Sequence, residues 1–296
     1  MHFNLKNSFI LNKLKSPLRH NRLILSDDLS SLTDEISGDI YEIRDSIPVF
    51  IYSKSESDED KNYVEHYIID SEEFDYFEER FGGTADDERR VREYILSFIA
   101  KDRKEILDVG SGRAWVAGEL CKKGISVCSV DISFVNTHKA LQKYDNENHA
   151  AVVADAYALP FADESFDCVV SSEVIEHVHD PQGFIIELLR CVKRGGNLII
   201  TTPYKEKLIY NLCIHCNKKT PQNAHLHTFD EKILASFAAD NSIEQKYKTF
   251  GNKALLHLRT YKILRFFPFT LWRAVDSMFN HMIDKRAHII FRYHKV

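Results

Sequence analysis

Short apolar runs and longer amphipathic stretches alternate through the middle of the chain, between about residues 105 and 251. The apolar runs are EILDV, SVCSV, AAVVA, FDCVVSS and NLIITT, which are rich in Val, Ile and Ser and have the length of buried strands. A stretch with helical spacing follows each run. This alternation predicts an α/β fold, in which helices cover both faces of a mostly parallel sheet.

The two ends of the chain follow other patterns. Residues 1–52 end in YEIRDSIPVFIY, which predicts short strands with a turn and a small N-terminal module. Residues 53–100 begin as a polar linker and continue as a helical segment, in which Thr84 or Asp86 is expected to cap a helix that runs through Phe98. The main domain would then span residues 101–296, with insertions at 204–228 and 253–286 and a last strand in AHIIFRYH.

Composition narrows the class of protein. The chain has 296 residues, of which 44% are hydrophobic and 28% charged, and this excludes a disordered or low-complexity protein. The net charge of -5 gives no basic field for a nucleic-acid partner. Six scattered cysteines, no signal-peptide pattern and no run of about 18 apolar residues favour a soluble, cytoplasmic protein. The oligomeric state is left open.

The charge is unevenly distributed along the chain. Residues 53–94 carry a net charge of -9, and residues 253–296 carry nine Lys or Arg against two Asp. The basic segment also holds Phe and Trp side chains, and Pro268 interrupts any long helix there. We expect an insertion between the last two strands with its aromatics packed inward. Peripheral contact with a membrane surface is the alternative.

Glycines and carboxylates follow the predicted strands. The first strand runs into DVGSGRA, and the next two strands end at Asp131 and just before Asp155. In a parallel sheet, ligands bind beyond the carboxyl ends of the strands, where an acid can accept both hydroxyls of a ribose. Taken by themselves, the glycines could also mark a tight turn that is required for steric reasons and binds no ligand. A nicotinamide site would explain Asp131 but prefers a third glycine where this chain has Ala114.

The whole series of motifs resembles the class I S-adenosylmethionine-dependent methyltransferases, in particular their ubiquinone-biosynthesis-like branch. The resemblance covers about residues 100–205 and rests on ILDVGSGRA, SVDIS, ADAYALPFADESFDCVVSSEVIEHVHDP and VKRGGNLIITTP. It implies a Rossmann-like sheet of seven strands with an antiparallel last strand. It also implies that the acidic helical segment forms a lid over the cofactor. The cofactor-binding residues that it implies are Asp108, Gly110, Gly112, Asp131, Ile132, Asp155, Ala156 and Ser172.

Methyl transfer from a sulfonium is an in-line displacement, so alignment and exclusion of water do most of the catalysis. A hydroxyl acceptor also needs a base, for which Glu173, Glu176 and His177 in SEVIEH are the candidates. A structural role competes with this reading, because Glu176 and His177 lie where a helix would begin after the strand. Tyr204, which follows the fifth strand, is a candidate for contact with the substrate.

A cysteine- and histidine-rich insertion follows the fifth strand. Cys213 and Cys216 have the spacing of zinc ligands, and His225 and His227 would complete a tetrahedral site. Alternatively, both cysteines are buried structural residues, or the two histidines line the acceptor pocket without a metal. The N-terminal module weakly resembles a zinc ribbon without its cysteines.

The sequence therefore predicts an S-adenosylmethionine-dependent methyltransferase that acts on a small-molecule or glycan-type acceptor. A non-catalytic binding or regulatory subunit of the same fold is the alternative from another class, and a nicotinamide oxidoreductase is the alternative enzyme.

Overall fold

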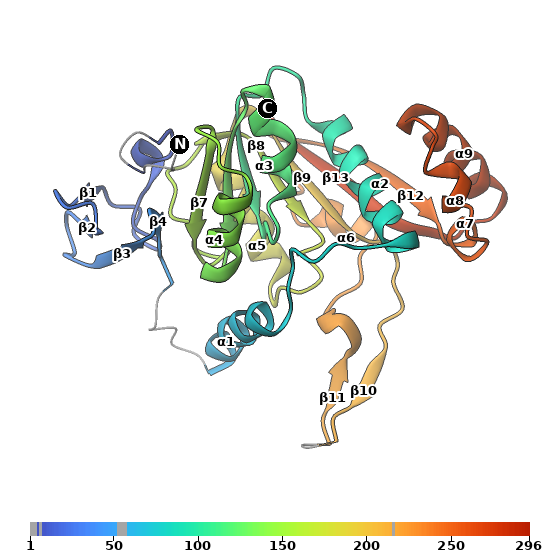
Figure 1. The fold of residues 1–296 in the computed structure, drawn as a ribbon, viewed down its shortest axis with the longest axis horizontal. Helices are drawn as coiled ribbons and strands as arrows, with labels where there is room; N and C mark the ends of the chain where they lie inside the picture. The colour runs from blue at the N-terminus through green and yellow to red at the C-terminus, as the bar shows by residue number, and fades with distance from the viewer. Residues whose placement is uncertain (1–4, 6–7, 52–57, 215–216) are drawn as a thin grey trace.

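A computed structural model describes residues 5, 8–51, 58–214 and 217–296 of the chain. Its centre is a sheet of seven strands in the order β12-β13-β9-β8-β5-β6-β7 (Figure 1). The strands are β5 (Glu105–Val109), β6 (Ser126–Asp131), β7 (His149–Val153), β8 (Phe166–Ser172), β9 (Val192–Pro203), β12 (Ile243–Asn252) and β13 (Arg286–Lys295). β13 runs antiparallel to both of its neighbours, and the other pairs are parallel. The α/β fold, with its mostly parallel sheet and antiparallel last strand, is confirmed.

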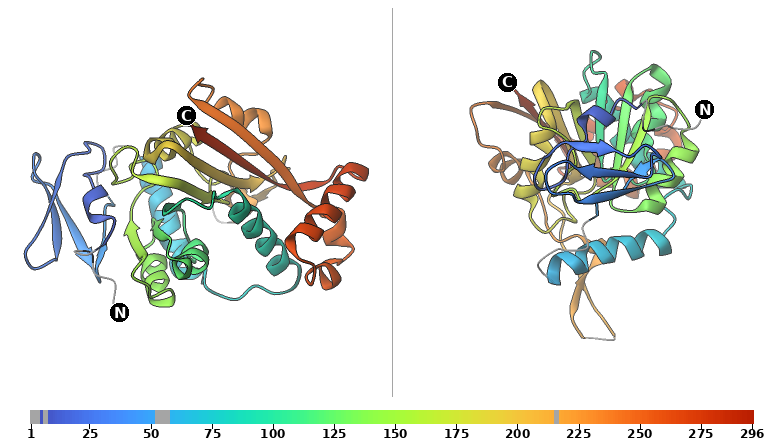
Figure 2. Two further views of the ribbon diagram at one scale, coloured as in Figure 1. Left: turned by 90° about the horizontal axis from the view of Figure 1, so that it is seen from above. Right: turned by 90° about the vertical axis from the view of Figure 1, so that its left-hand side faces the viewer.

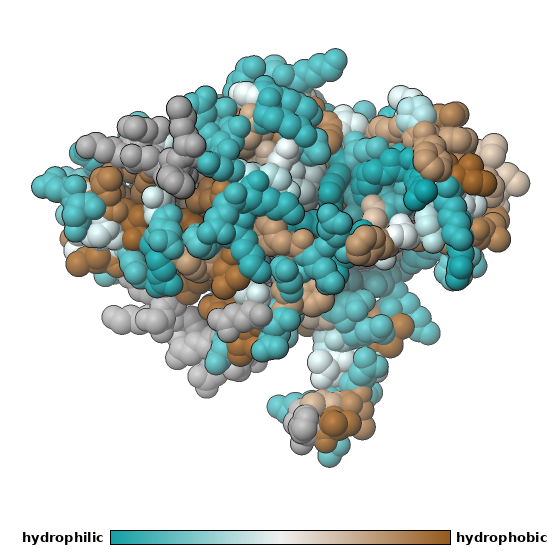
Figure 3. Space-filling view, in the orientation of Figure 1, coloured by the Kyte–Doolittle hydropathy of each residue, from teal (hydrophilic) through white to brown (hydrophobic). Residues whose placement is uncertain are grey.

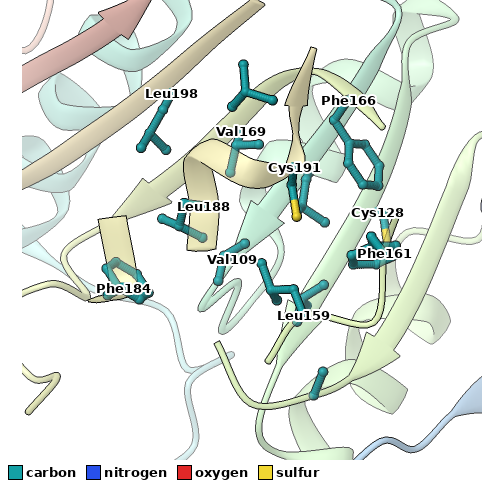
Figure 4. Packing of buried hydrophobic residues seen from close by; sticks show 14 of the residues in the cluster. Val109, Cys128, Leu159, Phe161, Phe166, Val169, Phe184, Leu188, Cys191 and Leu198 are labelled. Carbon is teal, nitrogen blue, oxygen red and sulfur yellow. The ribbon is translucent and has the colours of Figure 1, made fainter. Parts of the chain in front are cut away.

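Helices cover both faces of this sheet (Figure 2). They are α2 (Gly82–Phe98), α3 (Trp115–Leu120), α4 (Phe134–Lys143), α5 (Pro181–Cys191), α6 (Glu231–Ser236), α7 (Lys253–His257), α8 (Tyr261–Leu264) and α9 (Phe269–Met282). Side chains alternate between the faces, so in β5 Ile106 belongs to one apolar cluster while Leu107 and Val109 belong to another. The second cluster, beneath α5, is the one drawn in Figure 4.

Two helix starts differ from the expectation. α2 begins at Gly82, and Phe81 is its N-cap without a side-chain hydrogen bond, so Thr84 and Asp86 lie inside the helix. No helix begins at Glu176 or His177. α5 begins at Pro181, where the Oδ1 atom of Asp180 accepts a hydrogen bond from the backbone N–H of Gly183 at 3.0 Å. β8, which ends at Ser172, is therefore followed by a loop, and Glu176 and His177 belong to this loop and not to a helix.

The N-terminal residues form a separate antiparallel sheet that packs against the edge of the main one. Its strands are β1 (Leu23–Leu25), β2 (Ser31–Asp34), β3 (Ile40–Arg44) and β4 (Ile47–Pro48). The backbone N–H of Phe50 donates to Val153 O in β7 at 2.8 Å, and Leu14 bridges to Phe161. This part shares an apolar cluster with the main sheet through Leu32.

Three segments extend beyond the central part of the sheet. α1 (Asp58–Glu73) contacts α4, and the hairpin of β10 (Tyr210–Leu212) and β11 (Lys219–Pro221) extends away from the body after β9 (Figure 1). The helices α7 to α9 stand between β12 and β13 at the end opposite the N-terminal sheet. None of the described helices combines the length and the apolar character needed to cross a bilayer.

Candidate functional site

A cavity of about 550 Å³ lies at the carboxyl ends of the parallel strands, between the sheet and α1. Each of the loops after β5, β6, β7 and β8 contributes to its wall, and α1 contributes Tyr67. Ligands of open α/β sheets bind at this edge, and the volume suits a small molecule. The predicted site residues in the wall are Gly110, Gly112, Asp131, Ile132, Asp155, Ala156, Glu173 and His177.

The turn after β5 needs both of its glycines. Gly110 has a φ of +68°, and a Cβ atom there would lie 2.5 Å from Cγ2 of Val174. Gly112 has a φ of +48°, and its missing Cβ leaves room next to the ring of Tyr76. Left-handed backbone geometry disfavours residues with a Cβ. The turn can therefore lie close to a ligand in the cavity.

Asp131 ties this turn to the end of β6. Its Oδ2 atom accepts a hydrogen bond from Gly112 N at 2.8 Å, and its Oδ1 atom accepts one from Ser133 N at 3.0 Å. An ionised carboxylate has about four acceptor positions, so capacity remains for a hydroxyl of a bound ligand. Burial raises the pKa of Asp131, and the backbone donors oppose this shift. This arrangement fits the ribose contact that the resemblance implies.

Asp108 lies behind the cavity. It is buried in β5 and does not belong to the cavity wall, and its Oδ2 atom has no hydrogen-bond partner in the described part of the chain. Burial, together with the charge of Asp131, raises the pKa of Asp108 to about 8. Asp108 is therefore mainly protonated at neutral pH, whereas the backbone N–H donors to Asp131 favour the charged form of that carboxyl group.

Asp155 and Ala156 form the wall beyond β7. The Oδ1 atom of Asp155 accepts from the backbone N–H of Tyr157 at 2.9 Å, and the Tyr157 hydroxyl accepts from Asp180 N at 2.8 Å. These bonds tie the loop to the start of α5. Ser172 is turned away from the cavity wall, and its hydroxyl lies 3.0 Å from that of Thr201 in β9.

Glu173 is held in an uncommon backbone conformation, with a φ of +56°. Its Oε2 atom lies 3.7 Å from Nδ1 of His288, and its Oε1 atom has no hydrogen-bond partner among the described residues. Nε2 of His288 lies 2.9 Å from a carboxylate oxygen of Asp87 in α2. Burial opposes protonation of His288, but the two carboxylates outweigh it and raise the pKa to about 10. His288, which the sequence analysis missed, is thus a largely buried cation, with 12% of its side chain exposed, that joins β13, α2 and the cavity wall.

His177 is a neutral histidine in the same wall. Burial, followed by the neighbouring His225, lowers its pKa to about 4. Its Nδ1 atom lies 3.3 Å from Ala224 O, which only accepts hydrogen bonds, so Nδ1 carries the proton. Nε2 is then left without a proton. A neutral imidazole of this tautomer is able to accept a proton from a bound hydroxyl.

The predicted zinc ligands are spread along the insertion. Cys213 follows β10 in the projecting hairpin, Cys216 lies outside the described residues, and Nε2 of His227 is buried without a hydrogen-bond partner in the described chain. His225 instead joins Glu176 and His177, with ligand atoms within 4.8 Å of one another. Zinc remains a prediction. Metal analysis of the purified chain tests it, and a content well below one zinc per chain would contradict it.

Tyr204 lies at the root of this insertion, outside the cavity wall. Its hydroxyl donates to a carboxylate oxygen of Glu231 at 2.8 Å, which anchors the end of β9 to the start of α6. His225 forms a short hydrogen bond through Nδ1 with Glu206 and lines a neighbouring hollow that shares His177 and Asn223 with the cavity. Tyr204, His225 and His227 are all absent from the wall of the cavity itself, and of the three only His225 lines this hollow.

The pKa of His288 predicts a pH-dependent stability. The folded pKa of about 10 lies above the ordinary 6.5, so the stabilisation is complete below pH 6.5 and is lost as the pH rises toward 10. We expect His288→Gln to lower the free energy of unfolding by about 2 kcal/mol at neutral pH, and by progressively less toward pH 10. Urea unfolding across this pH range measures the difference.

His149→Gln is the matched control for this measurement. His149 is also buried, but its pKa is lowered to about 4, so its contribution to stability is constant above pH 6.5. A difference between the wild type and His288→Gln that stays equally constant would contradict the assignment of a buried cation.

The chain matches known proteins over this part of the fold. A family profile described as "Methyltransferase domain" matches residues 107–200. The chain is 32% identical over 148 residues to a ubiquinone biosynthesis O-methyltransferase of Rickettsia akari, covering 46% of this chain and 59% of the relative. It is 34% identical over 112 residues to a demethylmenaquinone methyltransferase of Corynebacterium efficiens, covering 38% and 46%. The matched region contains every wall residue of the loops after β5 to β8. Residues 107–200 of the chain therefore match a methyltransferase domain.

Solved structures agree with the fold of this methyltransferase domain. Phosphoethanolamine N-methyltransferase 2 of Haemonchus contortus, in complex with phosphomonomethylethanolamine and S-adenosylhomocysteine, aligns with a TM-score of 0.51 and 17% identity, over 80% of this chain and 58% of its own. The cyclase SpnF aligns with a TM-score of 0.51 and 18% identity, over 80% and 94%. Because a cyclase shares the fold, the fold alone does not define the reaction. The chain spans about half the length of the curated relatives.

Proposed function

We propose that the chain transfers a methyl group from S-adenosylmethionine to a hydroxyl group of a small, quinol-like acceptor. The observation that carries this proposal is the cavity itself, which combines a glycine turn, the carboxyl group of Asp131 and the Nε2 atom of His177, whose Nδ1 atom holds the proton. The names of the relatives, which concern ubiquinone and menaquinone, support an acceptor of the quinol class.

The residues present fit the cofactor. Asp131 keeps acceptor capacity for the ribose hydroxyls, and the wall at Asp155 and Ala156 would hold the adenine. The backbone at Gly110 and Gly112 would allow the methionine part to approach closely. When bound, the cofactor supplies a methyl group that is already activated by its positively charged sulfur.

The protein would align the acceptor, exclude water and receive a proton. Tyr67 and Tyr76 belong to the cavity wall on the side of α1, where they would shield the reacting groups from water. The acceptor oxygen would bond to the methyl carbon as the carbon–sulfur bond breaks, and the hydroxyl proton would pass to Nε2 of His177. The carboxyl group of Glu173, whose Oε1 atom has no hydrogen-bond partner among the described residues, lies in the same wall.

His177→Ala is expected to lower kcat by about 100-fold or more, because it removes the proton acceptor. The dissociation constant for S-adenosylhomocysteine should stay close to that of the wild type, because the cofactor contacts are left in place. His179→Ala is the matched control, since His179 is an exposed residue two positions along the same loop. Transfer of labelled methyl groups to a panel of catechols and hydroquinones measures kcat.

The same assay separates the proposal from its alternatives. Methylation of glycans but not of catechols would show that the acceptor is a glycan and not a quinol. Binding of S-adenosylhomocysteine without transfer to any panel member or cell-extract component would favour the non-catalytic subunit. An unchanged kcat in His177→Ala would contradict the role of this histidine as the base.

A further inference from the structure

The helices α7, α8 and α9 form an insertion between β12 and β13 at one end of the molecule (Figure 2). They pack on the body through buried side chains, including Leu255, Leu264 and Trp272, which join the apolar cluster beneath α2. Arg90 of α2 donates to Leu264 O at 2.7 Å and lies over the ring of Trp272. The insertion is therefore a fixed part of the fold, and its outer face is a defined surface.

α9 carries a second apolar stripe that faces away from the core. Its buried residues Trp272, Asp276 and Asn280 lie four positions apart. Leu271, Met278 and Met282 recur at spacings of seven and four on the other side, with exposed fractions of 47%, 55% and 70%. A helix of a globular domain normally places polar residues on its outer side. The outer side of α9 therefore presents these large apolar side chains beside exposed polar ones, Arg273, Ser277 and His281.

α8 and the turns on either side of it also expose large apolar side chains. Leu258, Ile263 and Phe266 are 70%, 68% and 74% exposed. Figure 3 shows hydrophobic surface over α8 and α9 in this part of the molecule. Clustered exposed apolar side chains of this size mark a surface that another body covers.

Positive charges are exposed on the same insertion as these apolar side chains. Six exposed cations stand in the insertion: Lys253, Arg259, Lys262, Arg265, Arg273 and Lys285. None of them forms a salt bridge within the described part of the chain. The two acids of the insertion do not offset them. Asp276 is buried, accepting from Asn252 N at 2.8 Å, and Asp284 lies 3.4 Å from Arg286.

We propose that the outer face of α7 to α9 docks on the surface of an anionic lipid bilayer. Lipid phosphates would pair with the six cations, and Phe266, Met278 and Met282 would enter the boundary between headgroups and acyl chains. An anionic bilayer provides phosphates for the cationic side chains and an apolar interior for the apolar ones over the same broad surface. The acidic α2 of a second copy fits less well, because its carboxylates already have partners. These pairs are Asp86 with Arg89, Glu88 with Arg92 and Glu93 with Arg90.

Flotation of the full chain with vesicles tests the proposal. We expect binding to phosphatidylcholine vesicles that contain phosphatidylglycerol, and much weaker binding to phosphatidylcholine alone. The variant Phe266→Ser/Met278→Ser/Met282→Ser should bind the anionic vesicles at least about tenfold more weakly, because three large apolar side chains are lost. Ile36→Ser/Ile186→Ser is the matched control, since these residues are 79% and 55% exposed on other faces. All substitutions are at exposed positions, and thermal unfolding checks the fold.

A charge variant tests the second component of the surface. Lys262→Glu/Arg265→Glu should weaken binding to anionic vesicles by about fivefold for each charge removed, whereas Lys122→Glu/Lys123→Glu, on exposed residues after α3, should not. Absence of binding by the wild type at low salt would overturn the proposal. Equal binding by the serine variant and its control would also overturn it. So would a dimer, seen by sedimentation, that the serine variant abolishes while vesicles stay unbound, because the face would then join two copies.

Discussion

Gly110→Ala is expected to weaken the binding of S-adenosylhomocysteine by more than about tenfold. The new Cβ would lie 2.5 Å from Cγ2 of Val174, and the backbone φ of +68° already disfavours it. Gly110 and Val174 both belong to the cavity wall, so a shift of either residue to relieve this contact changes the shape of the site. Calorimetric titration with S-adenosylhomocysteine measures the loss.

Two further variants separate the steric effect from backbone strain. Gly124 has a φ of +75°, and a Cβ atom added there would meet nothing within 4 Å, so Gly124→Ala should reduce stability without changing binding. Adding Val174→Ala to Gly110→Ala should recover part of the affinity, because it removes the atom that the new Cβ meets. Wild-type affinity in Gly110→Ala would contradict the proposed position of the cofactor.

Asp131→Ala is expected to cost at least about tenfold in affinity for the same ligand, because a charge-assisted hydrogen bond contributes about 1.5 to 3 kcal/mol. Two losses combine here. The variant removes the acceptor proposed for the ribose, and it releases Gly112 N, which Asp131 holds at 2.8 Å. Calorimetry again gives the dissociation constant.

Asp167→Ala controls for the loss of a structural carboxylate. Asp167 accepts hydrogen bonds from Lys104 N at 2.9 Å and Glu105 N at 3.0 Å, near the amino end of β5 and away from the cavity. The variant Asp167→Ala should lower the free energy of unfolding and leave the affinity for S-adenosylhomocysteine unchanged. If the two variants bound S-adenosylhomocysteine equally well, the ribose would be held elsewhere.

The strands and the cavity wall could be predicted because both follow from local pattern. Runs of Val and Ile become buried strands, and a residue that ends a parallel strand lies at the ligand edge of the sheet. Asp131 and Glu173 reach the cavity for this reason. The position of Ser172, one residue before Glu173, shows the limit of the argument, because side chains alternate between faces at a strand end.

His288 could not be predicted, because its role depends on contacts between distant segments. It lies opposite Pro203 where β13 returns antiparallel to β9, and it meets Asp87 and Glu173 there. No spacing in the sequence brings these residues together. The proposed zinc ligands show that closeness in sequence does not ensure closeness in the fold, because Cys213 lies in the turn of the projecting hairpin and His225 follows β11, beyond the hairpin.

Some aromatic side chains of the C-terminal insertion pack toward the core and others face outward. Trp272 packs inward as expected, and Phe266 is exposed. The helical period allows α9 to have an apolar side toward the core and another toward the outside, and composition alone does not distinguish the two. Only the packing of the insertion against α2 and β12 shows which side remains uncovered.

Binding of S-adenosylhomocysteine to the full chain is the most direct test of the central claim, that the cavity between α1 and the sheet holds the methyl-donor cofactor. Calorimetry should show one site per chain with a dissociation constant well below about 1 mM. NAD should give no comparable heat, because the turn lacks a third glycine at Ala114. No binding of S-adenosylhomocysteine at millimolar concentration, or tighter binding of NAD, would contradict the account.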